Sequence, residues 1–256
     1  MHFGCDTWGQ LGAPGSTWKL VVPQLSASRV QGSMAARHDE TPPENSKQEL
    51  QNPGFTKEQR DYASDLKEKY ADSLVIVRSI RKKDRAEVNN TAFFVDAHGT
   101  IVTTKENLFL PNEKLSDRII TFHRLDGTPY NNQRLISSPT DKNSHISPFI
   151  YVWRVDAKST SIPILSERPA DGDLLTGLGV DAGTEDTPPV QGRVKEWPKP
   201  DRFTWSVTTM AGSNGSPIFN LSGNAEAIQV SPSVEEPTVQ GVPLPVKQLR
   251  KLMANK

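Results

Sequence analysis

The residues of this chain that could carry out covalent chemistry gather near its carboxyl end, in the run TTMAGSNGSPIFN. Two hydroxyl groups, those of Ser213 and Ser216, flank Asn214 in this run. A serine attacks a carbonyl group only when a base takes its proton, and the candidate bases are His123, in a predicted strand, and His145, in a predicted loop. The amide of Asn214 is neither basic nor nucleophilic. Acyl transfer here would therefore need one of the two serines and one of the two histidines.

Other chemistries have less support in the sequence. No His/Cys group has the spacing of a metal site, and no Gly-rich phosphate loop occurs, so we expect neither a metal nor a cofactor. The 30 basic and 30 acidic side chains cancel, so the net charge does not favour nucleic acid as a partner. The run RSIRKKDR is interrupted by Asp84 and is typical of a solvated turn. No apolar stretch approaches the roughly 20 residues that span a bilayer, so we expect no membrane insertion.

The cysteine content and the amino terminus bear on the compartment. Cys5 is the single cysteine, which excludes an intramolecular disulfide and fits a reducing compartment. No secretory hydrophobic region precedes the folded part, so we expect an intracellular, cytoplasmic protein. The alternative is an organelle transit peptide, because residues 1–37 carry Lys19, Arg29 and Arg37 against one acid, Asp6, together with several serines.

The elements that must position these residues begin after a polar leader. Residues 1–54 are rich in Gly, Pro, Ser and Gln and cannot bury enough apolar surface to offset their ordering entropy, so this leader is predicted to be disordered. The domain should span residues 55–256. It should open with a helix over residues 56–71, capped by Thr56 and Gln59, and close with a helix over residues 245–254.

Between the two helices the sequence favours β-structure. Short β-rich runs are separated by Gly-, Pro- and Asp-rich turns, with hairpins predicted at Ala97–Gly99 and at Asp126-Gly127. Many short strands punctuated in this way indicate an all-β barrel or sandwich.

Five phrases stand in order between Ser73 and Met253: NTAFFVDAHGTIVTTKENLF, RIITFHRLDGTPYNNQRLISSPTDKNSHISPFIYVWRVD, ADGDLLTGLGV, AGSNGSPIFNLSGNAEAI and GVPLPVKQLRKLM. In order and spacing they resemble the trypsin-like domain of the high-temperature-requirement serine proteases. The resemblance implies two antiparallel six-stranded β-barrels of the trypsin and chymotrypsin type, with the site in a cleft between them. The inward core residues would include Phe93, Val95, Ile101, Ile120 and Phe122.

The same resemblance indicates what stands at the catalytic positions. Catalysis in that family requires a serine nucleophile, a histidine that takes its proton, and an aspartate that orients the histidine. Glu106 aligns with the histidine, Phe149 with the aspartate and Asn214 with the serine. Only a shifted register would bring Ser147 or Asp141 to the aspartate position. No catalytic residue is therefore expected.

The turn of the nucleophile loop is nonetheless kept, in Gly212, Ser213, Asn214, Gly215 and Ser216. The N–H groups of Gly212 and Asn214 could still form an oxyanion hole, or the glycines could serve only a turn with positive φ angles. The strand TWSVTTMAGS that precedes the loop is predicted to face a substrate, so that an extended peptide could pair with it.

Three functional hypotheses follow. The first is an inactive protease homologue that acts as a binding or regulatory module for a protein or peptide. The second is an atypical serine endopeptidase that uses Ser213 or Ser216 with His123 or His145. The third is a structural scaffold whose leader or terminal helix makes the interactions. The oligomeric state stays open.

Overall fold

The computed structural model describes residues 54–105, 108, 113–139, 146–180, 187–207, 213–230 and 239–254. The predicted leader, apart from Gly54, lies outside the described residues, as do Cys5 and the residues of the possible transit peptide. Among the helices that the structure describes, none is long and apolar enough to cross a bilayer.

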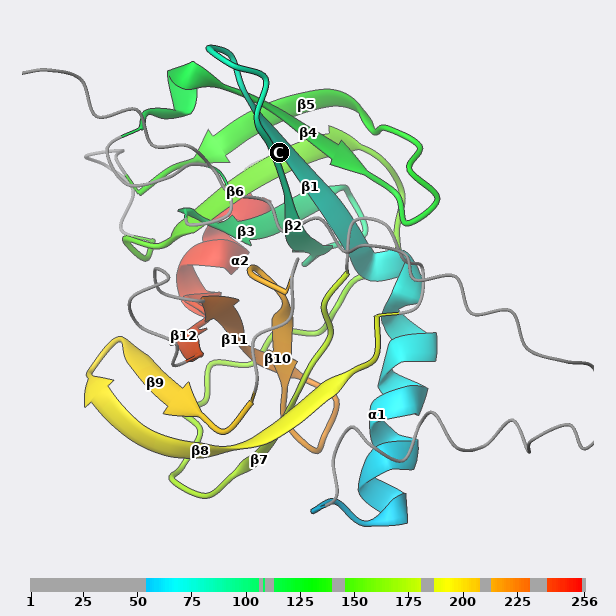
Figure 1. The fold of residues 1–256 in the computed structure, drawn as a ribbon, viewed down its shortest axis with the longest axis vertical. Helices are drawn as coiled ribbons and strands as arrows, with labels where there is room; N and C mark the ends of the chain where they lie inside the picture. The colour runs from blue at the N-terminus through cyan, green and yellow to red at the C-terminus, as the bar shows by residue number, and fades with distance from the viewer. Residues whose placement is uncertain are drawn as a thin grey trace, which may run out of the picture. The chain divides into compact units, whose positions relative to one another are not determined.

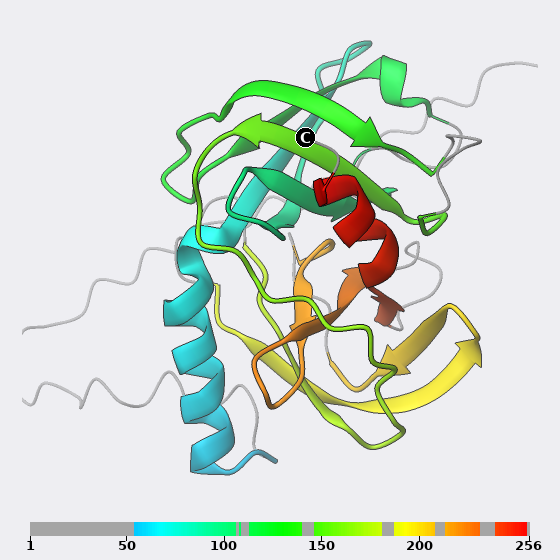
Figure 2. The same ribbon diagram turned by 180° about the vertical axis from the view of Figure 1, so that it is seen from behind.

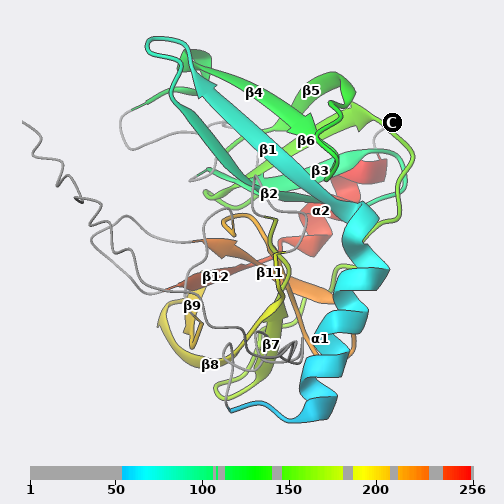
Figure 3. The same cartoon turned by 45° about the vertical axis from the view of Figure 1, so that its right-hand side comes forward.

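The first helix, α1 (Lys57–Tyr70), begins where its capping residues predict. The Thr56 hydroxyl accepts a hydrogen bond from the Gln59 N–H, and the Gln59 side chain accepts one from the Thr56 N–H, which forms the capping box. The buried face of α1 includes Leu66 and Tyr70. The Tyr70 ring stacks on Phe219 with centroids 5.3 Å apart. Figure 1 shows α1 in cyan beside the lower group of strands, and Figure 3 shows it along the same strands from another side.

The first group of strands forms a six-stranded antiparallel sheet in the order β4-β1-β2-β3-β6-β5. Tyr130, which directly precedes the edge strand β5, donates its N–H to the carbonyl of Phe122 in the other edge strand, β4, at 2.9 Å, which holds the two edge strands near each other, as in a barrel. The predicted hairpin turns are confirmed, because Gly99 and Gly127 both have a φ of 83°. The strands are β1 (Leu74–Arg81), β2 (Glu87–Phe94), β3 (Thr100–Thr104), β4 (Arg118–His123), β5 (Asn131–Ser137) and β6 (Ile150–Asp156). Short 3-10 turns precede β1 and β4, at Ala71–Ser73 and Leu115–Asp117.

The second group of strands is a closed antiparallel barrel in the order β10-β11-β12-β9-β8-β7. Because the barrel is closed, each of its strands has a paired neighbour on both sides. The strands are β7 (Leu174–Gly177), β8 (Val190–Lys199), β9 (Arg202–Trp205), β10 (Pro217–Phe219), β11 (Ala225–Val230) and β12 (Gln240–Pro243). The last helix, α2 (Val246–Ala254), follows β12.

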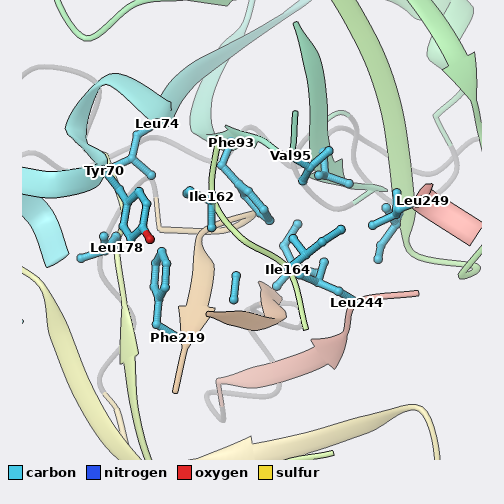
Figure 4. Close-up of a cluster of buried hydrophobic side chains, with 14 of the residues drawn as sticks. Tyr70, Leu74, Phe93, Val95, Ile162, Ile164, Leu178, Phe219, Leu244 and Leu249 are labelled. Carbon is cyan, nitrogen blue, oxygen red and sulfur yellow. The ribbon is translucent and has the colours of Figure 1, made fainter. Parts of the chain in front are cut away.

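The two barrels share an apolar cluster, called here the inter-barrel cluster. Figure 2 shows α2, in red, reaching from the second barrel toward the first. In Figure 4 the Tyr70 ring lies beside Phe219, while Phe93 and Leu249 belong to the same cluster. The fully buried members are Phe93, Val102, Ile150, Val152, Ile162, Phe219, Ala225, Ile228 and Leu249.

The predicted core of the first barrel is confirmed for most of its members. Phe93, Val95, Ile101 and Phe122 are buried, whereas Ile120 is partly buried and packs against the interior cluster of the barrel. Ile101 and Phe122 belong to that interior cluster, whereas Phe93 and Val95 belong to the inter-barrel cluster.

Candidate functional site

Phe149, the residue that aligns with the aspartate, directly precedes β6 and lies beside the end of β3. Thr104, the last residue of β3, pairs with Ile150, the first residue of β6. One residue further, the Lys105 N–H donates to the Phe149 carbonyl at 2.8 Å. The backbone therefore brings Lys105, which directly precedes the histidine position, next to the aspartate position. Glu106 itself lies outside the described residues.

Phe149, which aligns with the aspartate, has a cation above its ring. Phe149 is partly buried and packs against the inter-barrel cluster. The guanidinium carbon of Arg202, from β9 of the second barrel, lies 4.3 Å from the centroid of the Phe149 ring. A cation at this distance is attracted by the ring quadrupole. Arg202 also donates from Nη1 to the Gln240 side chain at 3.2 Å. The hydroxyl of Ser147, the alternative aspartate position, accepts a hydrogen bond from the Phe149 N–H at 3.3 Å.

The two serines of the nucleophile loop are buried and engaged. Ser213 is 3% exposed and Ser216 is 0% exposed. The Ser213 hydroxyl accepts a hydrogen bond from Nε2 of Gln229 at 2.7 Å, and the Ser216 hydroxyl donates to the Ser213 carbonyl at 2.5 Å. Space around Ser216 is also tight, since a side chain on Gly179 would meet its hydroxyl at 3.0 Å. The Ser213 hydroxyl is therefore tied to β11, and the Ser216 hydroxyl to the backbone of the loop.

Asn214, at the serine position, ties the loop to the first barrel. Its carbonyl accepts a hydrogen bond from the Thr91 N–H in β2 at 2.9 Å. The next residue, Gly215, has a φ of 78° and donates from its N–H to the Gln229 carbonyl at 2.8 Å. The positive φ confirms the turn requirement that the sequence predicted for Gly215. Gly212 lies outside the described residues, so one of the two expected oxyanion donors is not placed.

The candidate base His123 is engaged within its own hairpin. It is 8% exposed, with Nδ1 2.9 Å from the Gly127 carbonyl and Nε2 2.9 Å from the Thr121 hydroxyl. Neither Ser213 nor Ser216 is among its hydrogen-bond partners. The other candidate base, His145, and the alternative Asp141 lie outside the described residues.

The predicted substrate-facing strand has no open edge at its first two residues. Thr204 pairs with Gln240 of β12 on one side and with Glu196 of β8 on the other. The barrel closes through this strand, so a peptide has no open edge to pair with at Thr204 or Trp205. Within the same segment, residues 208–212 lie outside the described residues, so the prediction stays open for them.

Sequence reasoning missed Arg202 and Gln229, which the fold brings to the aligned catalytic positions. Gln229 carried a usable signal, since a glutamine in the apolar run AEAIQV predicts a buried amide that needs a partner. Arg202 carried none, because nothing in its neighbourhood along the chain points to Phe149. Among the residues that the structure describes, no group of three or more His, Cys, Asp or Glu side chains could hold a metal ion.

Comparison with solved structures identifies the fold. The crystal structure of the serine endoprotease from Yersinia pestis is similar to this chain with a TM-score of 0.57 and 20% sequence identity, over 76% of this chain and 67% of that one. No protein-family model matches the sequence, and no curated protein matches it either. The chain has an all-β, trypsin-like fold of two six-stranded barrels with a leading and a terminal helix.

Proposed function

We propose that residues 55–256 form a catalytically silent trypsin-like domain that acts as a binding or regulatory module for a protein or peptide. The observation that carries the proposal is the contact between Phe149 and Arg202 at the aspartate position. In a working triad this position holds a carboxylate that orients the histidine and stabilises the imidazolium that forms. A phenyl ring does neither.

The guanidinium of Arg202 adds an electrostatic argument. It lies over Phe149, the residue that aligns with the aspartate that would contact a catalytic imidazolium. A second cation there would raise the energy of that state, because like charges repel more strongly where little water screens them. The guanidinium would therefore disfavour general-base catalysis by a histidine, and the aligned positions hold no histidine, aspartate or serine.

The buried serines support the same proposal. A shifted nucleophile would have to leave the hydrogen bond that Ser213 accepts from Gln229 or the one that Ser216 donates to the Ser213 carbonyl. It would then have to reach attack geometry, and an error of about 1 Å can cost about a hundredfold in rate. The hydrogen bonds of His123 give no base for either hydroxyl.

Digestion of fluorescently labelled casein by the full chain tests the proposal. We expect no release of fluorescent peptides above buffer, and no change in the Ser213→Ala or Ser216→Ala variants. Cleavage that disappears in one of these variants would instead establish the atypical serine endopeptidase. Cleavage that survives both variants points to a contaminating protease, which a repeat preparation with a second affinity tag identifies.

The remaining expectations are part of the proposal. A protein or peptide is the proposed partner class, and a cytoplasmic location is proposed from the sequence. The scaffold hypothesis is distinguished by deletion of residues 1–54, which should leave partner binding unchanged if the domain makes the interaction.

A further inference from the structure

A polar cavity lies at the end of the first barrel where β1 begins and β6 ends. Its volume is about 450 Å³, which is within the range of small-ligand sites. Phe149 lies at the opposite end of β6, because it directly precedes this seven-residue strand, whereas Lys158 of the cavity follows it. Such a strand is about 20 Å long, so the cavity is separate from Phe149. The residues that line the cavity are Asp72, Arg124, Tyr130, Lys158, Ser159 and Thr160.

Hydrogen bonds between the surrounding segments hold the walls of the cavity in place. The buried Ser73 hydroxyl donates to the Thr160 carbonyl at 2.8 Å, which ties the segment after β6 to the turn that carries Asp72. Arg124 begins the turn between β4 and β5, where its N–H donates to the Thr128 carbonyl at 2.8 Å. The walls are therefore formed without a ligand, so a ligand would not have to order them.

Two cations line the cavity without a carboxylate partner. Within the part of the chain that the structure describes, neither Arg124 nor Lys158 takes part in an ion pair. Both residues are exposed, so a ligand can reach them from the solvent. The guanidinium carbon of Arg124 lies 4.9 Å from the centroid of the Tyr130 ring. A guanidinium stacked on a ring keeps its N–H groups at the edge, which suits a planar, bidentate carboxylate.

Tyr130 adds a neutral donor to the two cations. Burial raises the pKa of Tyr130 above its ordinary value of 10.0, opposed by the charge of Arg124 and reinforced by those of Asp126 and Asp72. The hydroxyl therefore keeps its proton at neutral pH and can donate a hydrogen bond to an anion. Thr160, which is exposed, brings a second hydroxyl to the lining.

The charges of the lining favour a monoanion. Arg124 and Lys158 contribute two positive charges and Asp72 contributes one negative charge, which leaves a net charge of +1. Asp126 lies outside the lining, on the turn between β4 and β5, where its carboxylate accepts a hydrogen bond from the Thr128 N–H at 2.8 Å. Asp72 would repel a dianion such as phosphate more strongly than a monoanion.

The geometry points to a carboxylate-binding pocket formed by Arg124, Lys158 and Tyr130 at this end of the first barrel, which takes a small organic acid. The guanidinium edge of Arg124 binds the carboxylate in a bidentate manner, and Lys158 supplies the second charge. The Tyr130 hydroxyl donates to the same group. This binding site goes beyond the proposed function and does not depend on it.

Nuclear magnetic resonance of the isotope-labelled full chain tests the pocket by titration with sodium acetate, with sodium chloride added to keep the ionic strength constant. We expect the backbone N–H signals of residues 158–160 to shift saturably, with a Kd of about 10 mM. Arg124→Gln should weaken acetate binding about tenfold, because it removes hydrogen bonds to a charged group. Asp72→Asn should strengthen it about threefold, because it removes a charge of the same sign as acetate.

Arg168→Gln is the matched control for Arg124→Gln. Arg168 is likewise an exposed arginine over an aromatic ring, with its guanidinium carbon 3.8 Å from the centroid of Trp197, and it does not line the cavity. Its replacement should leave the affinity for acetate unchanged. If Arg124→Gln does not fold, Lys158→Gln takes its place and should also weaken acetate binding.

Several results would overturn the carboxylate pocket. They are the absence of a saturable shift up to about 100 mM acetate, equal shifts with sodium chloride alone, and an unchanged affinity in Arg124→Gln. An equal loss of affinity in Arg168→Gln would reveal a general effect of net charge and would also refute the pocket. Inorganic phosphate that binds more tightly than acetate would overturn the assignment to a carboxylate.

Discussion

The backbone N–H of Thr91 in β2 donates a hydrogen bond to the carbonyl of Asn214, the residue at the serine position, over 2.9 Å. The Thr91 side chain makes a second link, because its hydroxyl accepts a bond from the Val180 N–H at 2.9 Å. Thr91 is 0% exposed, so both hydrogen bonds are buried. They join the nucleophile loop and the segment after β7 to the first barrel. The loop is held by the fold independently of any catalytic role.

Thr91→Val should therefore lower the free energy of unfolding by about 2 kcal/mol, because it leaves the Val180 N–H buried without an acceptor. The measurement is urea unfolding followed by tryptophan fluorescence. Thr91→Ser keeps the hydroxyl oxygen and should cost about 1 kcal/mol or less. Equal losses in the two variants would show that the hydroxyl bond contributes nothing.

The pair of Ser213 and Gln229 should behave as a coupled unit. Gln229→Leu removes the donor to a buried hydroxyl and should cost about 2 kcal/mol in unfolding free energy, whereas the double variant Ser213→Ala with Gln229→Leu should cost less than the sum of the single changes. Additive losses in urea unfolding would contradict the hydrogen bond between them.

Much of the fold could be predicted from the sequence because local signals set it. The capping box at Thr56 and the glycines at positions 99 and 127 each fix their own element, and the order of the phrases indicated the two barrels. The contact between Arg202 and Phe149 could not be predicted, since it joins the two barrels and depends on how they pack. The pairing of Thr204 with Gln240 could not be predicted either, because it is equally long-range.

Arg202 changes what rebuilding the triad requires. Phe149→Asp would place a carboxylate under the guanidinium, where the two groups should pair with each other. Arg202→Gln should thus cost about 1 kcal/mol in the wild-type chain, where it removes a cation–π contact, and about 3 kcal/mol in the Phe149→Asp background, where it strands a partly buried charge. Urea unfolding of the four chains measures the difference.

Phe149→Asn is the matched control for that comparison, because it is neutral and similar in size to aspartate. In its background Arg202→Gln should show no increased cost. It also follows that Glu106→His, Phe149→Asp and Asn214→Ser together need Arg202→Gln as a fourth change before a histidine could engage the new carboxylate. An unchanged cost of Arg202→Gln in all backgrounds would refute the pairing.

The buried carboxyl of Glu226 in β11 predicts a pH dependence of stability. Burial raises the pKa of Glu226 above its ordinary value of 4.5, opposed by the hydrogen bond from Asn220 and reinforced by the charges of Glu167 and Asp173. The stability linked to a raised pKa is present below pH 4.5 and is lost as the pH rises through the folded-state pKa.

Glu226→Gln stays neutral at every pH, so its melting temperature relative to wild type should rise between pH 4 and pH 7. Subtracting the two chains cancels the titration of the other groups. Glu196→Gln, at an exposed position on β8, serves as the control and should show no such trend. A difference in melting temperature between Glu226→Gln and wild type that stays constant across this pH range would exclude the predicted link between Glu226 ionisation and stability.

The central claim is that the aligned catalytic positions of this trypsin-like fold hold Glu106, Phe149 and Asn214 and support no acyl transfer. Intact-mass measurement after incubation with a fluorophosphonate tests it most directly, because the reagent adds covalently to an activated serine whatever the substrate preference. The account predicts an unchanged mass for the full chain. A stoichiometric adduct that is lost in Ser213→Ala or Ser216→Ala would contradict it.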